Sequence, residues 1–254
     1  MTHIREVRPH AHELKFVIGP DLAPKIRRWA RIHLDADTHG TGPFGDEYRT
    51  TSVYFDTDDH DVFHRRGSFG RSKYRIRRYG DEDAFFLERK MRQPGVLAKR
   101  RTRLPLVALE RLTAQVARAD WPGYWFHRRV TARRLGPVCQ VAYSRMARGV
   151  IRNGEMVRLT LDGDVRAQLA SEARFASDLG VPAMATVLAL PALSNRLILE
   201  LKYRGAPPAI FRQLVEAFAL TPQAASKYRL GMVALGQVVP EEIMTVTGTD
   251  PFYA

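Results

Sequence analysis

Lysine and arginine side chains occupy alternate positions in several short segments of this chain. In residues 73–79, Lys73, Arg75 and Arg77 are separated by one residue each. Successive side chains of a β-strand point to opposite faces, so these three cations would share one face. The same spacing within residues 12–16, 85–90, 141–145, 157–162 and 197–202 puts Lys15, Lys90, Arg145, Arg158 and Lys202 on polar faces. The pattern predicts strands with one apolar and one largely cationic face.

Single carboxylates accompany the lysines on these faces. Each of three glutamates precedes a lysine by two positions: Glu13 with Lys15, Glu88 with Lys90, and Glu200 with Lys202. For any one strand, an ordinary solvent-exposed sheet face explains the alternation well. Across six strands that explanation weakens, because like charges on neighbouring strands destabilise a sheet and exposed faces usually mix signs. We expect the cationic faces to converge on a shared, water-filled interior.

An interior of this kind needs a compensating anion, because an unpaired buried charge is costly. A chain of phosphates fits, since arginine binds phosphate oxygens in pairs and lysine binds them as a point charge. The glutamates would repel such a ligand unless a divalent cation lay between them. Mg²⁺ or Mn²⁺ is commonly shared between one or two carboxylates and substrate phosphates. The residue types therefore predict a metal-assisted phosphate site.

The elements that would position these side chains are mainly strands, with a few helices covering their apolar faces. Helix signals occur after Asp21, which could cap a helix through residues 25–29, and after Pro208, where apolar residues recur at helical spacing. Residues 108–119 and the basic segment 124–135 are the other helix candidates. We expect an α+β, β-rich fold: a closed antiparallel β-barrel with flanking helices.

Composition narrows the class of protein further. Lys and Arg total 40 against 27 Asp and Glu, a formal net charge of +13, which points to an anionic partner. The single cysteine, Cys139, excludes a disulfide framework and reads as a buried core residue. No signal peptide or membrane-spanning stretch is evident, so a cytoplasmic location is expected. The basic run at residues 127–134 is compatible with peripheral membrane association. We expect one domain over residues 1–254, with a core at about 12–235 and a C-terminal tail at 237–254.

Nine segments, in order, resemble the catalytic domain of the vacuolar transporter chaperone (VTC) family. That family belongs to the triphosphate tunnel metalloenzymes, together with the adenylate cyclase and thiamine triphosphatase (CYTH) group. The matching segments are ELKF at 13–16, TSVYFD at 51–56, YRIRRY at 74–79, FLERK at 86–90, KRRTR at 99–103, VAYSR at 141–145, VRLTLD at 157–162, LELK at 199–202 and SKY at 226–228. The CYTH group carries two glutamates before its first lysine, whereas here Ala11 occupies the first of those places. This departure favours the VTC branch.

The resemblance implies an eight-stranded tunnel whose basic lining binds triphosphate or polyphosphate. By motif, the expected catalytic residues are Arg75, Arg77, Lys90, Arg145, Arg158 and Lys202. The expected substrate-binding residues are Lys15, Lys73, Lys99, Arg101, Ser226 and Lys227. Glu200 is the expected metal ligand, with Glu13 and Glu88 as further candidates, and the cofactor would be Mn²⁺ or Mg²⁺.

The function implied is phosphoryl transfer on a nucleoside triphosphate, triphosphate or polyphosphate. Polyphosphate synthesis from a nucleoside triphosphate is the first expectation, and a triphosphatase that uses the same residues is the alternative. A non-catalytic polyanion or nucleic-acid binder is a second alternative. No nucleic-acid partner is expected, because aromatic residues do not share the cationic faces apart from Tyr79. The sequence predicts neither the oligomeric state nor a protein partner.

Overall fold

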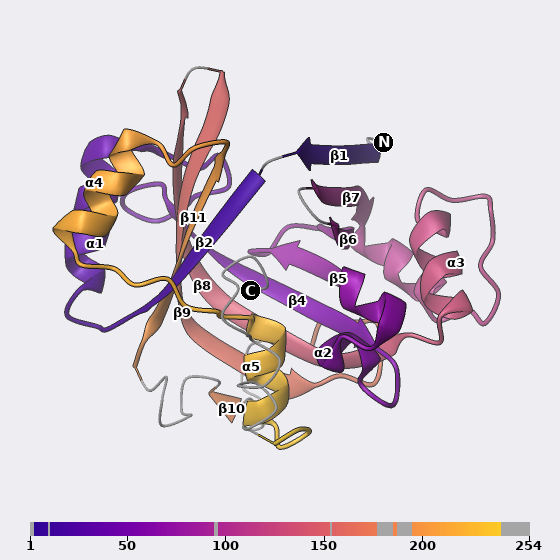
Figure 1. Cartoon of the computed structure of the whole chain (residues 1–254). Helices are drawn as coiled ribbons and strands as arrows, with labels where there is room; N and C mark the ends of the chain where they lie inside the picture. The colour runs from indigo at the N-terminus through magenta and orange to yellow at the C-terminus, as the bar shows by residue number, and fades with distance from the viewer. Residues whose placement is uncertain are drawn as a thin grey trace.

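A computed structural model describes residues 3–9, 11–93, 96–152, 154–176, 185–186 and 195–239 of the chain (Figure 1). Most of the expected C-terminal tail lies outside these residues. The long strands are β1 (His3–Pro9), β2 (Ala11–Ile18), β4 (Glu47–Asp56), β5 (Ser72–Tyr79), β6 (Ala84–Gln93), β7 (Val96–Pro105), β8 (Gly136–Arg152), β9 (Glu155–Leu169) and β11 (Leu197–Arg204). Two short strands, β3 (Asp35–Ala36) and β10 (Ala185–Thr186), add to β8 and β9.

These strands form one antiparallel sheet. Along its main path the order is β1-β7-β6-β5-β4-β8-β9-β11-β2. The path has nine strands where the resemblance implied eight. Among the described residues the two end strands, β1 and β2, exchange no backbone hydrogen bonds, so the sheet is not closed by them.

The sheet nevertheless curls into a barrel-like form. Strand β6 is third on the path and β2 is ninth, so in a flat sheet they would lie roughly 28 Å apart at the usual strand spacing. Instead, Lys90 of β6 and Glu13 of β2 form an ion pair of 3.0 Å. Strand β1 also ends at Pro9 and β2 begins at Ala11, so chain continuity holds the two ends of the path together. The curl confirms the expected barrel architecture.

Helices cover the outside of the curl, as the apolar strand faces require. Helices α1 (Ala23–His33) and α4 (Ala209–Ala217) pack on β2, β9 and β11. The contact buries Phe16, Leu159, Leu161, Leu199 and Leu201 against Ile26, Ala30, Phe211 and Leu214. Each fully buried leucine or phenylalanine contributes roughly 1.5–3 kcal/mol. The alternate residues of the same strands therefore face the interior.

Three further helices pack against the remaining strands, and the last of them lies on the inner side of the curl. Helices α2 (Asp61–His64), α3 (Tyr124–Ala132) and α5 (Lys227–Ala234) share a core with β4, β5, β6 and β8. Cys139 is fully buried in this core, as expected. None of the described helices has both the length and the apolar character needed to cross a bilayer.

Two of the local expectations are wrong. Residues 108–119 do not form an α-helix: a 3₁₀ helix at Leu106–Leu112 is followed by turns. Val116 in this segment is 74% exposed, so no packing stabilises a longer helix. Helix α1 is capped at Leu22 without a side-chain hydrogen bond, and Asp21 is therefore not its cap.

Candidate functional site

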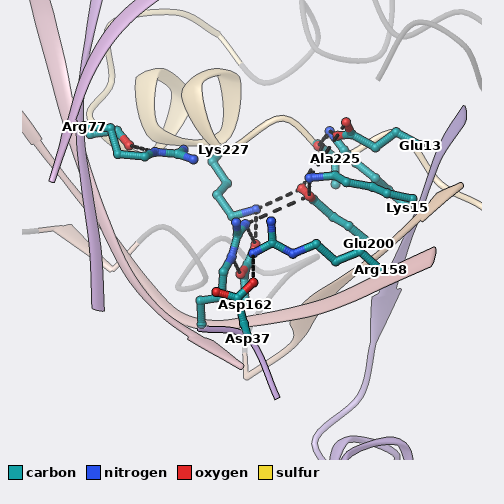
Figure 2. Close-up of polar contacts among 12 residues, drawn as sticks. Glu13, Lys15, Asp37, Arg77, Arg158, Asp162, Glu200, Ala225 and Lys227 are labelled. Atoms are coloured by element: carbon teal, nitrogen blue, oxygen red, sulfur yellow. Dashed lines mark hydrogen bonds and ion pairs between the residues drawn. The ribbon is translucent and has the colours of Figure 1, made fainter. Parts of the chain in front are cut away.

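The inner face of the curled sheet carries a large excess of positive charge. Together with the loop after β3 and the start of α5, this face gathers eleven cations and five carboxylates, which leaves six net positive charges. The cations are Lys15, Lys73, Arg75, Arg77, Lys90, Lys99, Arg101, Arg145, Arg158, Lys202 and Lys227, and the carboxylates are Glu13, Asp37, Glu88, Asp162 and Glu200. Figure 2 shows Arg77 reaching inward from one side and Lys15 from the other, with Lys227 between them.

Two glutamates and three lysines form the first network, on β2, β11 and β6. Glu13 lies 3.0 Å from Lys90 and 3.4 Å from Lys15. Glu200 lies 3.0 Å from Lys202, which is also 4.0 Å from Glu13. Lys202 therefore stands between the two carboxylates, and one third of its side chain remains exposed (33%). Solvent reaches this part of the interior.

Asp162 is the centre of an adjoining network. It is fully buried on β9 and receives two hydrogen bonds from its cross-strand neighbour Arg145, at 2.6 and 2.7 Å. Lys227, at the start of α5, lies 2.6 Å from Asp162 and 3.3 Å from Glu200. Helix α5 thus contributes a cation that ties β9 to β11 from within the barrel.

Glu88 holds a separate group of cations on β5, β6 and β7. Its carboxylate oxygens lie 2.6 Å from Arg75, 3.0 Å from Lys99 and 3.3 Å from Arg101. Within the described part of the chain, Glu88 shares no cation with Glu13 or Glu200. Lys99 and Arg101 face inward together, whereas Arg100 between them lies over the Trp125 ring on the outside.

Arg77 differs from the other buried cations. Its side chain is 5% exposed, and it donates a hydrogen bond to Ser52 Oγ at 3.0 Å. No carboxylate of the described residues lies within ion-pair distance of it. Two hydroxyls of the same interior, Tyr143 OH and Thr160 Oγ1, are also buried, and neither has a hydrogen-bond partner among the described residues. Buried hydroxyls are usually hydrogen-bonded, to protein, ordered water or a ligand.

Arg158 is paired with a loop rather than with a strand. Its guanidinium lies 2.8 Å from Asp37, in the loop after β3, and donates to Tyr48 OH at 3.0 Å. These contacts fix Arg158 at the edge of the charged interior, and Figure 2 shows it together with Asp37.

The segment that leads into α5 lines the remaining side of the interior. Lys15 donates to the carbonyl oxygen of Ala225 at 2.9 Å, and Lys73 donates to Ser226 Oγ at 3.3 Å. These contacts join β2 and β5, which lie at distant places on the sheet path, to two adjacent residues. Tyr228, one residue after Lys227, donates a short hydrogen bond of 2.5 Å to the buried Asp56.

The electrostatic environment favours the ionised form of the glutamates and disfavours the charged form of several lysines. Burial alone would raise the pKa of the Glu13 and Glu200 carboxyls, but the lysines beside them hold both pKa values well below the ordinary value. Burial, followed by the positive charges of Lys15 and Arg229, holds the pKa of Lys73 well below its ordinary value. Burial also lowers the pKa of Lys90 and of Lys99, although Glu13 and Glu88 partly oppose it. An anion that binds in the site would stabilise the charged form of these lysines.

The structure brings the whole set of expected residues to one interior. The two positions that the sequence left ambiguous, Lys99 and Arg101, both face inward. Asp162, Asp37, Tyr48 and Ser52 were missed. Asp162 had a signal, because it alternates with Arg158 on one strand face, whereas Asp37 lies in a loop with no periodicity. The roles of the expected residues stay predictions.

The chain was compared with a set of protein-family models, with curated proteins and with solved structures. A family model described as the VTC domain matches residues 10–236. A candidate adenylate cyclase from Bacillus halodurans aligns with a TM-score of 0.50 and 16% identity, over 87% of this chain and 95% of that chain. A candidate adenylyl cyclase from Hippeastrum, for which a dominant triphosphatase activity is reported, aligns with a TM-score of 0.45 and 13% identity, over 90% and 97%. The search of curated proteins gives no match. The Bacillus halodurans protein shares the fold.

Proposed function

This chain belongs to the VTC domain family, and we propose that it binds chains of phosphate groups inside its curled sheet and transfers phosphoryl groups between them. The first candidate reaction is polyphosphate synthesis from a nucleoside triphosphate. The observation that carries the proposal is the excess of six positive charges in a partly solvated interior. Charges of one sign held this close need a mobile polyanion to offset their repulsion.

The proposed roles follow from how strongly each cation is already engaged. Arg77 has no carboxylate within ion-pair distance among the described residues, so it would donate to phosphate oxygens without first losing a partner. Arg145 is held rigidly by Asp162 and would present its outer donor edge. Arg75 and Arg158 would contribute charge from either side. Fixed donors of this kind stabilise the charge that develops during phosphoryl transfer without having to reorganise.

The lysines would bind and orient the chain of phosphates. Lys15, Lys90 and Lys202 surround Glu13 and Glu200, and each has an ammonium group that can turn toward a ligand. Lys73, Ser226 and Lys227 would hold the phosphates nearest to α5. Lys99 and Arg101 would extend the binding surface along β7.

A divalent cation would be held beside Glu13 and Glu200, where it would take the place of the Lys202 ammonium. Both carboxylates lie within 4.0 Å of the Lys202 ammonium, so a single cation can face both of them. No group of three or more His, Cys, Asp or Glu side chains suited to a metal occurs in the described part of the chain, so other ligands would be phosphate oxygens and water. Mg²⁺ and Mn²⁺ are commonly bound in this way, and there they would neutralise phosphate charge. Glu88, also expected as a metal ligand, balances three cations elsewhere.

The acceptor decides between two reactions on the same residues. The end of a phosphate chain is already ionised and needs no general base, so synthesis requires only that donor and acceptor be aligned. Attack by water instead would make the protein a triphosphatase.

Turnover of ATP with Mn²⁺ or Mg²⁺, followed by separation of the products on a gel, tests the proposal. Long polymer supports synthesis, orthophosphate supports the triphosphatase alternative, and no reaction with either metal contradicts the catalytic proposal. In Glu200→Ala, metal-dependent turnover should be abolished while tripolyphosphate binding is retained, because Lys15, Lys202 and Lys227 lose a competing carboxylate. Glu155→Ala, on the surface of β9, is the matched control. Full activity in Glu200→Ala would remove Glu200 from the mechanism.

A further inference from the structure

Four arginines gather on the outside of the barrel, away from the inner-face site. Arg89 of β6 and Arg100 of β7 are cross-strand partners, and their neighbours in each strand face inward. Arg129 and Arg133 belong to α3 and its C-terminal end, and α3 lies against this outer surface through Trp125 and Arg100. We call these four residues the outer arginine cluster.

Aromatic rings hold three of the guanidinium groups in place. Arg133 lies 4.1 Å from the centre of the Phe69 ring, Arg100 lies 4.3 Å from that of Trp125, and Arg89 lies 5.5 Å from that of Tyr74. A stacked guanidinium keeps its N–H groups directed outward along its plane. The side chains are therefore ordered before any ligand arrives, which lowers the entropy lost on binding.

Three of the four arginines lie without an acidic partner among the described residues. Arg89 and Arg133 donate to the hydroxyls of Ser72 and Ser68, and no carboxylate of the described residues pairs with Arg89, Arg129 or Arg133. Like charges on directly opposed strand positions destabilise a sheet, so the Arg89 and Arg100 pair carries a cost. Partial burial lowers the pKa of Arg89, and the charges of Arg129 and Arg133 lower it further. A solvated surface with no ligand would more usually interleave acidic residues here.

We propose that the outer arginine cluster is a second binding site for phosphate chains, separate from the inner face. Ordered guanidinium groups bind phosphate oxygens in pairs, and a ligand with many linked phosphates can contact several of them at once. Arg129 is exposed and Arg89 and Arg133 are half-buried, so the site is open to solvent. Long polyphosphate would bind here, whereas a ligand of three phosphates would depend on the inner face. The choice of a phosphate polymer rests on the proposed function, but the site itself does not require catalysis.

The test compares two double variants that remove the same charge. Arg129→Gln with Arg133→Gln alters the cluster, and Arg28→Gln with Arg212→Gln alters exposed positions on α1 and α4. Calorimetry with long-chain polyphosphate should show binding about tenfold weaker for the cluster variant than for the control variant. Tripolyphosphate affinity should be the same in both. Equal weakening in the two variants would mean general charge attraction and would overturn the proposal.

Two further measurements distinguish loss of phosphate binding from misfolding and from membrane binding. Arg129→Gln alone, at an exposed position, gives a variant whose folding is not in question, and about threefold weaker long-chain binding is expected. Vesicles containing phosphatidic acid test a lipid source of the same phosphate chemistry: binding of vesicles that depends on the cluster, without a change for polyphosphate, would overturn the proposal in favour of a membrane. Failure of the wild-type protein to bind tripolyphosphate would contradict the function proposed for the inner face. The comparison of the two double variants with long polyphosphate would still show whether the outer arginine cluster binds it.

Discussion

Replacing Arg77 should affect stability and ligand binding in opposite directions. In Arg77→Met the chain loses a buried cation that has no carboxylate within ion-pair distance among the described residues and feels the charge of Glu88 only from further away, together with one hydrogen bond to Ser52. The lost hydrogen bond costs about 1 kcal/mol, whereas an uncompensated buried charge costs several kcal/mol. The free energy of unfolding without ligand should therefore be unchanged or higher by about 1–3 kcal/mol.

The same substitution should weaken triphosphate binding strongly. A charge-assisted hydrogen bond is worth about 1.5–3 kcal/mol, so losing two from one guanidinium should reduce affinity at least about 100-fold. At a ligand concentration of about 100 times the wild-type dissociation constant, tripolyphosphate should stabilise the wild-type protein by about 2.7 kcal/mol. The stabilisation of Arg77→Met should be below about 0.5 kcal/mol under the same conditions.

Urea unfolding followed by tryptophan fluorescence, with and without tripolyphosphate, measures both effects. Arg145→Met is the contrasting variant, because Arg145 makes two hydrogen bonds to the fully buried Asp162. Breaking that pair should lower the free energy of unfolding by about 3–5 kcal/mol even without ligand. Destabilisation of Arg77→Met as large as that of Arg145→Met, with the full stabilisation by tripolyphosphate retained, would refute both expectations for Arg77.

Three further outcomes are expected. Burial and neighbouring cations depress the pKa of Lys73, so polyanion binding should raise this pKa and take up protons, and calorimetry in buffers of different ionisation enthalpy that showed no proton uptake would contradict this expectation. Without ligand, the depressed pKa should make the free energy of unfolding increase with pH toward the ordinary lysine pKa. Tyr228→Phe removes a hydrogen bond to the buried Asp56 and should lower the free energy of unfolding by about 1.5–3 kcal/mol, whereas an unchanged urea midpoint would show that the bond contributes nothing. Burial raises the pKa of the Cys139 thiol to about 12, so a thiol reagent should label it only after unfolding, and rapid labelling of the folded protein at pH 8 would disprove that burial.

The faces of the strands could be predicted from the sequence because the side-chain period of a strand is two residues. Alternation alone assigned Lys15, Arg75, Arg145 and Glu200 to the interior and their apolar neighbours to the outside. The helix after Pro208 could be predicted because its apolar stripe packs on the sheet, burying Ile210, Phe211 and Leu214. Where no such packing exists, at residues 108–119, the helix prediction was wrong.

The partners of the charged groups could not be predicted in this way. Lys90 was expected beside Glu88, its strand neighbour, but its carboxylate partner is Glu13, at the other end of the sheet path. That pairing depends on the curl of the whole sheet, which no local pattern encodes. Helix α5 was also missed, because its residues Lys227–Val233 are buried on every side and so show no helical periodicity.

A crystal structure with tripolyphosphate and Mn²⁺, with data collected at the manganese absorption edge, tests the central claim most directly. The account predicts phosphate density within hydrogen-bond distance of Arg77 and Arg145 and an anomalous peak beside Glu13 and Glu200. Phosphate bound only on the outer surface, with the inner-face cations unchanged, would contradict it.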